Sequence, residues 1–507
     1  MKFTKSTWAA VGATLLLAAC GGGSGGSAGT QNLNPARGEL MQSPPPRITA
    51  LTAADYNAKL SGSASGQGLL ALSGGPVPCG IDVQYIQYGT VGGKGEATTA
   101  SAALIVPTGT DPKCTGARPI VLHAHGTAVE RRYNLADFTD STNPAYGESQ
   151  VIAAMYAGQG FIVVAPNYAG YDTSTLSYHP FLVPTQQPKD MLDALVAAKA
   201  ALPTLISGVT TNGKVFLSGY SQGGYVALAT HRAMITDPTT VAKLASLSLV
   251  VKASAPMSGP YALQSFGDQI VGGAVNASST VLLPMLITGY QKSYGVSPAT
   301  NLYAATSDLY ESNYATGIES LFPGALSYTN LIATGKVPQA ALFAADSLPA
   351  APAGPLNVLW SAGFGTPNLI KSSFRTDYLT NPTNQLRANL IVNDLTASTS
   401  PVGATSNPVG ATMLCGGSND PTVYYATNTG TLLALPAWSG APTGVVTVVN
   451  MDLTGVTPNP ADPFLTLKQS FTSKNPTSAA DYASTYHANL VPYCVRAARS
   501  YFSNPAF

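Results

Sequence analysis

The residues best suited to chemistry form the pentapeptide Gly-Tyr-Ser-Gln-Gly at residues 219–223. An apolar run at 215–217 precedes it, and a helix-forming stretch at 225–234 follows it. A strand that turns abruptly into a helix strains the backbone of the turn residue, and flanking glycines remove the Cβ atoms that would collide there. We therefore predict that Ser221 is an exposed nucleophile and that the N–H of Gln222 points at an oxyanion.

A serine hydroxyl needs a base to take its proton, and that base is usually a histidine oriented by a carboxylate. In hydrolases with such a serine turn, the acid and then the histidine follow the serine along the chain. Of the five histidines, His487 alone lies after every plausible acid, so we predict it as the base, just before a C-terminal helix at 491–502. His231 lies in the helix leaving Ser221, and we interpret it as a surface or packing residue.

Asp420 is the first candidate for the acid. It follows a short apolar strand and two glycines, at a point where a turn would present its carboxylate. Three other aspartates remain alternatives, namely Asp394, Asp452 and Asp462. Asp452 follows a strand predicted at 445–450, which is one strand later than the usual position of the acid.

A second oxyanion donor is expected in the loop after an earlier strand. Residues 123–127 follow a strand at 120–122, so the N–H of Thr127 is the first candidate and that of Gly126 the alternative. A different interpretation takes His123 and His125 as a metal pair, because they share one face of a strand. No further histidine or acidic cluster with suitable spacing joins them, so we predict no metal site.

Short apolar segments alternate with helix-forming segments along the chain. Segments 81–88 and 98–106 read as an antiparallel pair around a turn at 92–95. Further strands are predicted at 119–123, 161–165, 215–217, 247–255, 411–415 and 445–450, and helices at 149–157, 189–201, 225–234 and 491–502. This alternation indicates an α/β fold, with a mostly parallel sheet covered by helices on both faces.

One interval interrupts this alternation. Residues 260–408 show no clear strand and are too long for a loop within a compact sheet, so we predict an inserted helical cap there. The two parts of the catalytic core would be residues 46–259 and 409–507. A separate C-terminal half is the alternative, but the missing acid and histidine lie just beyond the interval.

The first residues read as an export signal at 1–19, with two lysines before a short apolar stretch. Small residues precede Cys20, and a Gly/Ser/Pro-rich segment follows it, which resembles a bacterial lipoprotein signal. The resemblance implies a lipid on Cys20, a flexible tether over 20–45 and an envelope location, with Gly21 favouring the outer membrane. A plain secretory peptide is the alternative.

Four cysteines remain after Cys20, an even number that indicates two disulfides in an exported protein. Three pairings are possible, and we favour Cys79 with Cys114 and Cys415 with Cys494, because each pair brackets segments that the fold should bring together. The formal net charge is +1 and a tenth of the residues are charged, which excludes a nucleic-acid partner.

Several segments resemble the secretory lipase family of α/β-hydrolases, the lipase A type. The resemblance runs from about residue 80 to the C-terminus and is carried by residues 124–127, 165–171, 179–181, 219–223, 393–395 and 414–417 with Asp420. It implies ester hydrolysis by Ser221, Asp420 and His487, a lid near residues 260–400, and no cofactor. Asn167 departs from the family, where many relatives carry aspartate.

The sequence therefore predicts an exported, lipid-anchored serine ester hydrolase that forms an acyl-enzyme. Its substrates would be apolar acyl or aromatic esters, including lipids or polyesters. A serine peptidase on the same fold is the first alternative, although no propeller repeat is present. A binding protein that retains an inactive hydrolase fold, anchored to the membrane through its lipid, is the second.

Overall fold

The computed structural model describes residues 30–507, apart from residues 206, 350–359, 398–409, 454, 456 and 477. Within that part of the chain, nine strands form one sheet in the order β13-β12-β9-β8-β6-β7-β5-β4-β3. The strands are β3 (Arg47–Leu51), β4 (Gly80–Val91), β5 (Ala97–Thr108), β6 (Ala117–Ala124), β7 (Ile162–Pro166), β8 (Thr210–Tyr220), β9 (Val250–Met257), β12 (Ala411–Gly416) and β13 (Val446–Asn450). A separate short pair joins β1 (Thr30–Gln31) to β2 (Gln42–Ser43).

The sheet is parallel from β7 through β6, β8, β9 and β12 to β13, and antiparallel where β3, β4 and β5 are added. Strand β7 is buried along its whole length, as expected for a parallel strand with helices on both sides. The antiparallel pair predicted from the sequence is β4 with β5, and that prediction is confirmed.

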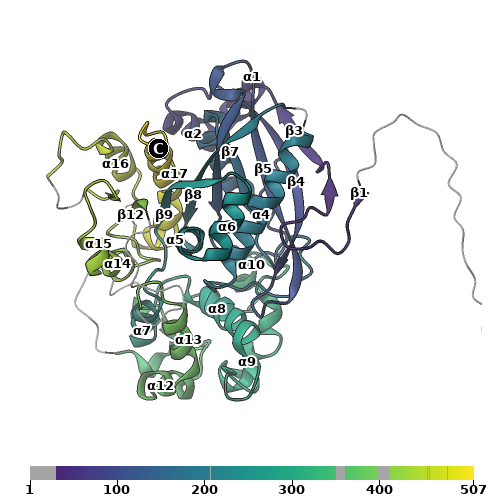
Figure 1. The fold of residues 1–507 in the computed structure, drawn as a ribbon. Helices are drawn as coiled ribbons and strands as arrows, with labels where there is room; N and C mark the ends of the chain where they lie inside the picture. The colour runs from purple at the N-terminus through teal and green to yellow at the C-terminus, as the bar shows by residue number, and fades with distance from the viewer. Residues whose placement is uncertain are drawn as a thin grey trace, which may run out of the picture.

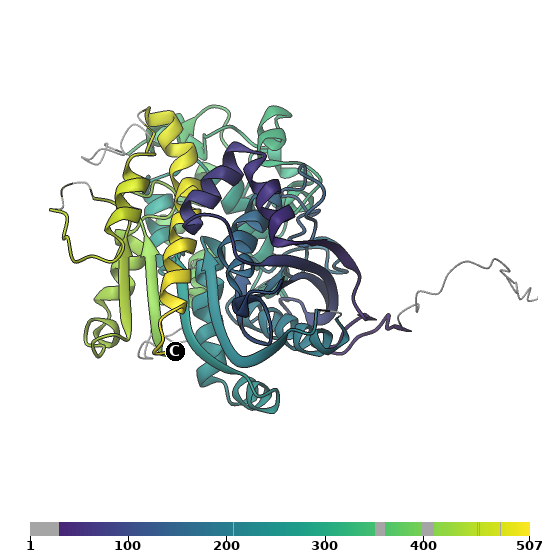
Figure 2. The same cartoon turned by 90° about the horizontal axis from the view of Figure 1, so that it is seen from above.

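Helices cover both faces of this sheet (Figure 2). The helices α4 (Gln187–Ala201), α5 (Gln222–Thr236) and α6 (Pro238–Ser246) form one layer, in which α4 packs on β4 and β7 and α5 on β8 and β9. The other layer contains α1 (Ala53–Ser61), α2 (Ala64–Ser73), α3 (Tyr146–Met155), α16 (Leu465–Thr472) and α17 (Ala479–Phe502). The prediction of a mostly parallel α/β sheet is therefore confirmed.

The interval predicted as a cap is mainly helical and gathers at one end of the sheet (Figure 1). It contains α7 (Leu263–Gly272), α8 (Ser279–Tyr294), α9 (Ser312–Ala315), α10 (Tyr328–Ala333), α12 (Ser372–Thr380) and α13 (Gln385–Asn393). Two short strands that the sequence did not indicate, β10 (Phe343–Ala344) and β11 (Phe364–Gly365), pair in parallel. The cap is tied to the loop after β6, because the N–H of Gly324 donates to the carbonyl of Val129 at 2.9 Å.

The remaining elements are short. They are the helices α14 (Thr431–Ala434) and α15 (Pro436–Ser439), a π-helical turn at Ala426–Gly430, and 3₁₀ turns at Pro112–Cys114, Ala157–Gln159, Leu202–Thr204, Thr306–Asp308, Ile318–Leu321 and Ala345–Ser347. Among the described helices, none combines the length and the apolar character that a bilayer crossing requires.

The flexible tether predicted over residues 20–45 is wrong for its second half. The N–H of Gly38 donates to the carbonyl of Gly89 at 2.8 Å, and the N–H of Met41 donates to that of Gln87 at the same distance. The Arg37 guanidinium also pairs with Asp193 at 3.0 Å. These bonds to the edge of β4 and to α4 outweigh the flexibility suggested by composition. The predicted signal at 1–19 and Cys20 lie outside the described residues.

Both predicted disulfides are confirmed. Cys79 is bonded to Cys114, and Cys415 to Cys494. The second bond joins the end of β12 to α17, so it connects the strand before Asp420 to the helix that carries His487.

Candidate active site

The serine turn lies between β8 and α5 and has the strained backbone that its glycines predict. Ser221 has φ 59° and ψ −121°, a combination that residues with side chains rarely adopt. A Cβ on Gly219 would lie 2.1 Å from the carbonyl oxygen of Gly223, and a Cβ on Gly223 would lie 2.0 Å from that of Ala124. Both positions therefore need glycine, and the N–H of Ser221 is fixed by a 2.9 Å bond to the carbonyl of Met257.

Asp420 and His487 form a direct hydrogen bond. The Nδ1 of His487 lies 2.6 Å from Oδ2 of Asp420, whose other oxygen accepts from the N–H groups of Thr422 at 2.9 Å and Val423 at 3.1 Å. The hydroxyl of Tyr220 donates to the carbonyl of His487 at 2.7 Å. Because the carboxylate accepts the Nδ1 proton, this arrangement selects the tautomer in which Nε2 of His487 carries a lone pair.

The Nε2 of His487 is buried and has no hydrogen-bond partner among the described residues. Ser221 and His487 line the same cavity, although no hydrogen bond joins them in this structure. Such contacts are often long without substrate and tighten when it binds. The two side chains therefore share one space, in which the imidazole lone pair is available.

His487 does not precede the C-terminal helix, as predicted, but lies inside it. Helix α17 starts at Ala479, where the side chain of Ser478 caps it by accepting from the N–H of Asp481. The sequence prediction began the helix at residue 491, yet the helix continues through Pro492. The helix therefore begins some three turns earlier than expected, and a rigid element carries the imidazole.

Asp452, the alternative acid that follows β13, forms hydrogen bonds to the turn before Asp420 and not to the imidazole of His487. Its Oδ2 accepts from the hydroxyl of Tyr486 at 2.6 Å and from the N–H of Asn419 at 2.9 Å. A Cβ on Gly417 would lie 2.1 Å from the Tyr486 hydroxyl, so this turn also depends on a glycine. Asp452 thus links the turn before Asp420 to the residue next to His487.

The other two alternative acids have different partners. Asp394 accepts from the N–H groups of Gln264 at 2.8 Å and Thr396 at 2.6 Å. Asp462 pairs with Lys468 at 2.7 Å. Of the four aspartates considered from the sequence, Asp420 is the one bonded to the imidazole of His487.

The loop after β6 brings Thr127 to the cavity that Ser221 and Gln222 also line. Gly126, the alternative oxyanion donor, already donates its N–H to Oε1 of Glu148 at 3.3 Å. A Cβ on Gly126 would meet nothing closer than 3.6 Å, so no close approach requires a glycine there. Gly126 also lines the cavity, but its N–H already has a partner, so Thr127 stays the first candidate for the second donor.

Gln222 is the first residue of α5, so its N–H has no partner within the helix. Its side-chain Nε2 donates to Nε2 of His179 at 2.7 Å, and Nδ1 of His179 donates to the carbonyl of Ala169 at 2.9 Å. Burial lowers the pKa of His179 to about 3, so this imidazole is neutral and can accept from Gln222. His179 thereby fixes the side chain at the start of α5.

His123 and His125 have protein partners at the nitrogens that a metal would need. The Nε2 of His123 lies 3.0 Å from Oε1 of Glu148. The two ring nitrogens of His125 face the carbonyl oxygens of Gly126 at 2.6 Å and Asn167 at 3.1 Å. No group of three or more possible metal ligands occurs within the described part of the chain.

Glu148 connects several parts of the loop after β6. Besides Gly126 and His123, it accepts from the hydroxyl of Tyr133 at 2.7 Å. Burial raises the pKa of Glu148, but its interactions with His123, His125 and Tyr133 together outweigh burial and hold that pKa below its ordinary value. An ionised carboxylate therefore anchors the loop that carries Thr127.

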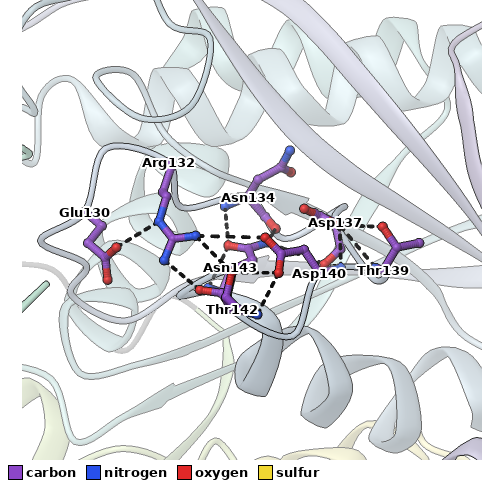
Figure 3. Close-up of polar contacts among 9 residues, drawn as sticks. Glu130, Arg132, Asn134, Asp137, Thr139, Asp140, Thr142 and Asn143 are labelled. Atoms are coloured by element: carbon purple, nitrogen blue, oxygen red, sulfur yellow. Dashed lines mark hydrogen bonds and ion pairs between the residues drawn. The ribbon is translucent and has the colours of Figure 1, made fainter. Parts of the chain in front are cut away.

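A network of polar contacts orders the chain between this loop and α3 (Figure 3). The Arg132 Nε donates to Glu130 at 2.9 Å, and its Nη2 donates to the carbonyl of Thr142 at 2.6 Å. The side chain of Asn143 donates to the carbonyl of Asn134 at 2.6 Å. These contacts close the segment between the loop after β6 and α3 on itself.

The cavity above Ser221 has a volume of about 400 Å³. Its walls are largely apolar, and more than half of the lining residues come from the interval 260–408. They include Leu263 and Phe266 of α7, Leu282 and Leu286 of α8, and Leu386 and Leu390 of α13. Such a lining suits an aliphatic or aromatic group and offers little to a charged one.

His231 is buried, and its Nδ1 lies 2.8 Å from the hydroxyl of Ser254 in β9. Burial lowers the pKa of His231 to about 3, so it is a neutral packing residue, as interpreted from the sequence. Sequence reasoning missed Glu148, His179 and Tyr486. Only Tyr486, next to His487, and His179, in one of the segments that resemble lipases, carried a signal that could have found them.

Residues 142–251 match the model of the secretory lipase family. The structure is similar to the rice cell wall degrading esterase LipA from Xanthomonas oryzae, with a TM-score of 0.66 and 27% identity over 92% of this chain and 98% of that one. A search of curated proteins finds no match.

Two further structures share the fold. One is a hydrolase of Legionella pneumophila, with a TM-score of 0.62 and 16% identity over 91% of this chain and 98% of that one. The other is lipase A of Candida antarctica in its closed state, with a TM-score of 0.50 and 13% identity over 83% and 78%. The predicted α/β-hydrolase fold and the resemblance to secretory lipases are thus confirmed.

Proposed function

We propose that this chain is a serine ester hydrolase that acts through an acyl-enzyme on Ser221. The observation that carries the proposal is the 2.6 Å bond between Asp420 and His487, with Nε2 of that histidine unpaired in the cavity that Ser221 lines. The matches to a lipase family and to an esterase support ester bonds as the target.

In the proposed reaction, Nε2 of His487 takes the proton of the Ser221 hydroxyl as its oxygen attacks the ester carbonyl. Asp420 keeps the imidazole oriented and stabilises its positive charge. The N–H groups of Thr127 and Gln222 receive the oxyanion, and each is worth ~3 kcal/mol in such a role. The imidazolium then protonates the leaving alcohol, and a water activated by the same imidazole releases the acid.

The apolar cavity favours esters with an apolar acyl or aromatic part. Its volume of about 400 Å³ is within the usual range for sites that enclose small ligands. With few polar groups at the walls contributed by the cap, affinity for such a substrate would come mainly from burial of apolar surface.

Labelling and ester hydrolysis test this proposal together. The parent should react with a fluorophosphonate probe at Ser221 and hydrolyse p-nitrophenyl esters, with rates that change along an acyl chain-length series. The Ser221→Ala variant should do neither, while Ser320→Ala, an exposed serine in the cap, should behave as the parent. Unlabelled parent protein would instead favour the inactive binding protein.

A serine peptidase remains the alternative on the same fold, because the same residues can attack amides. Comparing p-nitrophenyl esters with peptidyl amides of equal side chain separates the two. Faster turnover of the amides by the parent would overturn the preference for esters.

We also propose that the protein is exported and held at the cell envelope by a lipid on Cys20. The support is the sequence of the first residues, and the match to a secretory family agrees with export. The Cys20→Ser variant should move from the membrane fraction to the soluble fraction with its esterase activity unchanged. Unchanged membrane association of that variant would exclude this anchor.

A further inference from the structure

A second cavity of about 600 Å³ lies away from Ser221. It is formed by the first part of β6, the middle of β8 and the last turns of α17, and about 20 Å of extended strand separate Lys214 from Ser221. Its lining includes five cationic side chains and no acidic one; they are Lys113, Arg118, Lys214, Arg496 and Arg499.

These five charges are not neutralised within the described part of the chain, where none of them forms an ion pair. The guanidinium groups are instead held by neutral carbonyl oxygens. Arg118 donates to Gly160 at 2.7 Å, and Arg499 donates to Ser73 at 2.9 Å. Asp111 acts on Arg118 only through space and does not line the cavity.

Arg499 is the most buried of the five cations. Its side chain is 8% exposed, and its Nη1 is buried without a hydrogen-bond partner among the described residues. The unpaired donor leaves the positive charge of Arg499 uncompensated beside the cavity that this residue lines. Burial, with Arg496 nearby, lowers the pKa of Arg499 to about 10, so it remains charged at neutral pH.

This lining suits an anion with several oxygens on one centre. Such an anion can accept paired hydrogen bonds from arginine and is attracted by the compact charge of lysine. Apolar rings lie next to the cations, among them Phe161, Phe216 and Phe507. We propose that this cavity binds a phosphate group, as part of a phosphate ester with an apolar portion. The proposal does not depend on the esterase reaction.

A nucleic acid is a poorer occupant. Binding along a strand needs cations spaced over several phosphates, whereas these five line a single hollow. The formal net charge of the whole chain is only +1, so the positive potential is local to this cavity.

The test is calorimetric titration of the full chain at constant ionic strength. Two probes are used, namely inorganic phosphate and a soluble phosphatidylglycerol with short ether-linked chains, which an esterase cannot cleave. Binding of both is expected in the parent. Tighter binding of the lipid would assign the site to a membrane headgroup, and equal or tighter binding of phosphate would assign it to a free phosphate ester.

The Lys113→Glu/Lys214→Glu double variant should bind either probe at least about tenfold more weakly, because two positive charges beside the anion become negative. Neither lysine side chain makes a hydrogen bond or ion pair within the described chain, so folding should be preserved. The matched control is Lys336→Glu, an exposed lysine of the cap, which should bind as the parent does.

Absence of binding to the parent, or equal binding by parent and double variant, would overturn the proposal. Esterase activity and melting temperature establish that the double variant is folded. If it is not, crystals of the parent soaked with phosphate decide the question, since phosphate found outside this cavity also overturns the assignment.

Discussion

The hydrolase core and the cap contribute to the active site in different ways. Core side chains are fixed by short polar contacts, such as the 2.6 Å bonds of Asp420 to His487 and of Tyr486 to Asp452. The cap contributes mainly apolar side chains, including Leu286 of α8 and Leu390 of α13. In the proposed enzyme, the core would therefore supply the reacting groups, and the cap would decide which substrate groups fit.

The core and the cap should therefore tolerate substitutions to different degrees. Polar contacts in the core have narrow distance and angle requirements, so a small displacement removes them. Apolar walls instead set the volume available to the substrate. A substitution there changes the binding free energy in proportion to the apolar surface that is gained or lost. Substitutions in the two regions should thus differ in size and in the parameter they affect.

The largest effect is expected at the nucleophile. Ser221→Ala should lower kcat for a p-nitrophenyl ester by about 10⁶-fold, with KM nearly unchanged, because the acyl-enzyme cannot form. Steady-state kinetics on purified protein measures this. A residual kcat within tenfold of the parent would place the reaction on another residue.

Replacement of the acid should come next. Asp420→Asn should lower kcat by about 10⁴-fold, because the amide cannot hold the imidazole in the required tautomer. Asp462→Asn is the control. It loses the pairing of a partly buried carboxylate with Lys468, which makes no contact with His487, so kcat should stay within about twofold of the parent. Equal losses in the two variants would contradict the assigned role of Asp420.

The glycine requirement of the serine turn can be tested against a helix glycine. Gly223→Ala should lower the free energy of unfolding by ~3 kcal/mol or more, because the new Cβ would lie 2.0 Å from the carbonyl oxygen of Ala124. Gly68→Ala in α2 meets no atom within 4 Å and should raise that free energy by ~1 kcal/mol. Denaturant unfolding of both variants measures the difference.

The cap should affect selectivity and leave the reaction intact. Leu390→Trp reduces the space in the cavity, so kcat/KM for a long-chain ester should fall about 10- to 100-fold while that for acetate esters stays near the parent value. Leu379→Trp, at a leucine of α12 that is 52% exposed, is the control. A uniform loss over all chain lengths would show that the cap also positions the reacting groups.

The smallest effect concerns a buried carboxyl of the core. Burial raises the pKa of Asp190 from 3.8 to about 7, although the Tyr88 hydroxyl and the N–H of Ala169 donate to it. Between these pH values the folded protein holds a proton that the unfolded chain has lost, so this group's contribution to stability falls as the pH rises. The melting temperature of the parent, relative to that of Asp190→Asn, should therefore be lower at pH 7 than at pH 4. A constant difference would show that Asp190 does not titrate in this range.

Much of the core follows from local sequence signals. The strands, the serine turn and the cysteine pairs depend on residues close in sequence or on a small number of candidates, such as Ser221 between its glycines. His487 could be found by elimination because few histidines are present. The start of α17 was misplaced because Pro492 suggests a helix boundary, although the packed helix accommodates it.

The rest of the site depends on contacts between distant residues. Glu148 meets His123 only after the loop after β6 has folded back on α3, and no spacing in the sequence indicates that pairing. Asp452 was considered only as an alternative acid, since its bond to Tyr486 requires β13 and α17 to be adjacent. The second cavity could not be predicted from the sequence for the same reason, because its cations come from residues as far apart as Lys113 and Arg499.

The bond between Cys415 and Cys494 closes a chain segment that contains both Asp420 and His487. Once it has formed, the two side chains cannot move far apart, even when the local structure opens for a moment. Copies retained in a reducing cytosol lack this restraint, whereas copies in an oxidising compartment acquire it. For the exported ester hydrolase proposed above, oxidation of these two cysteines would therefore also keep the acid and the base near each other.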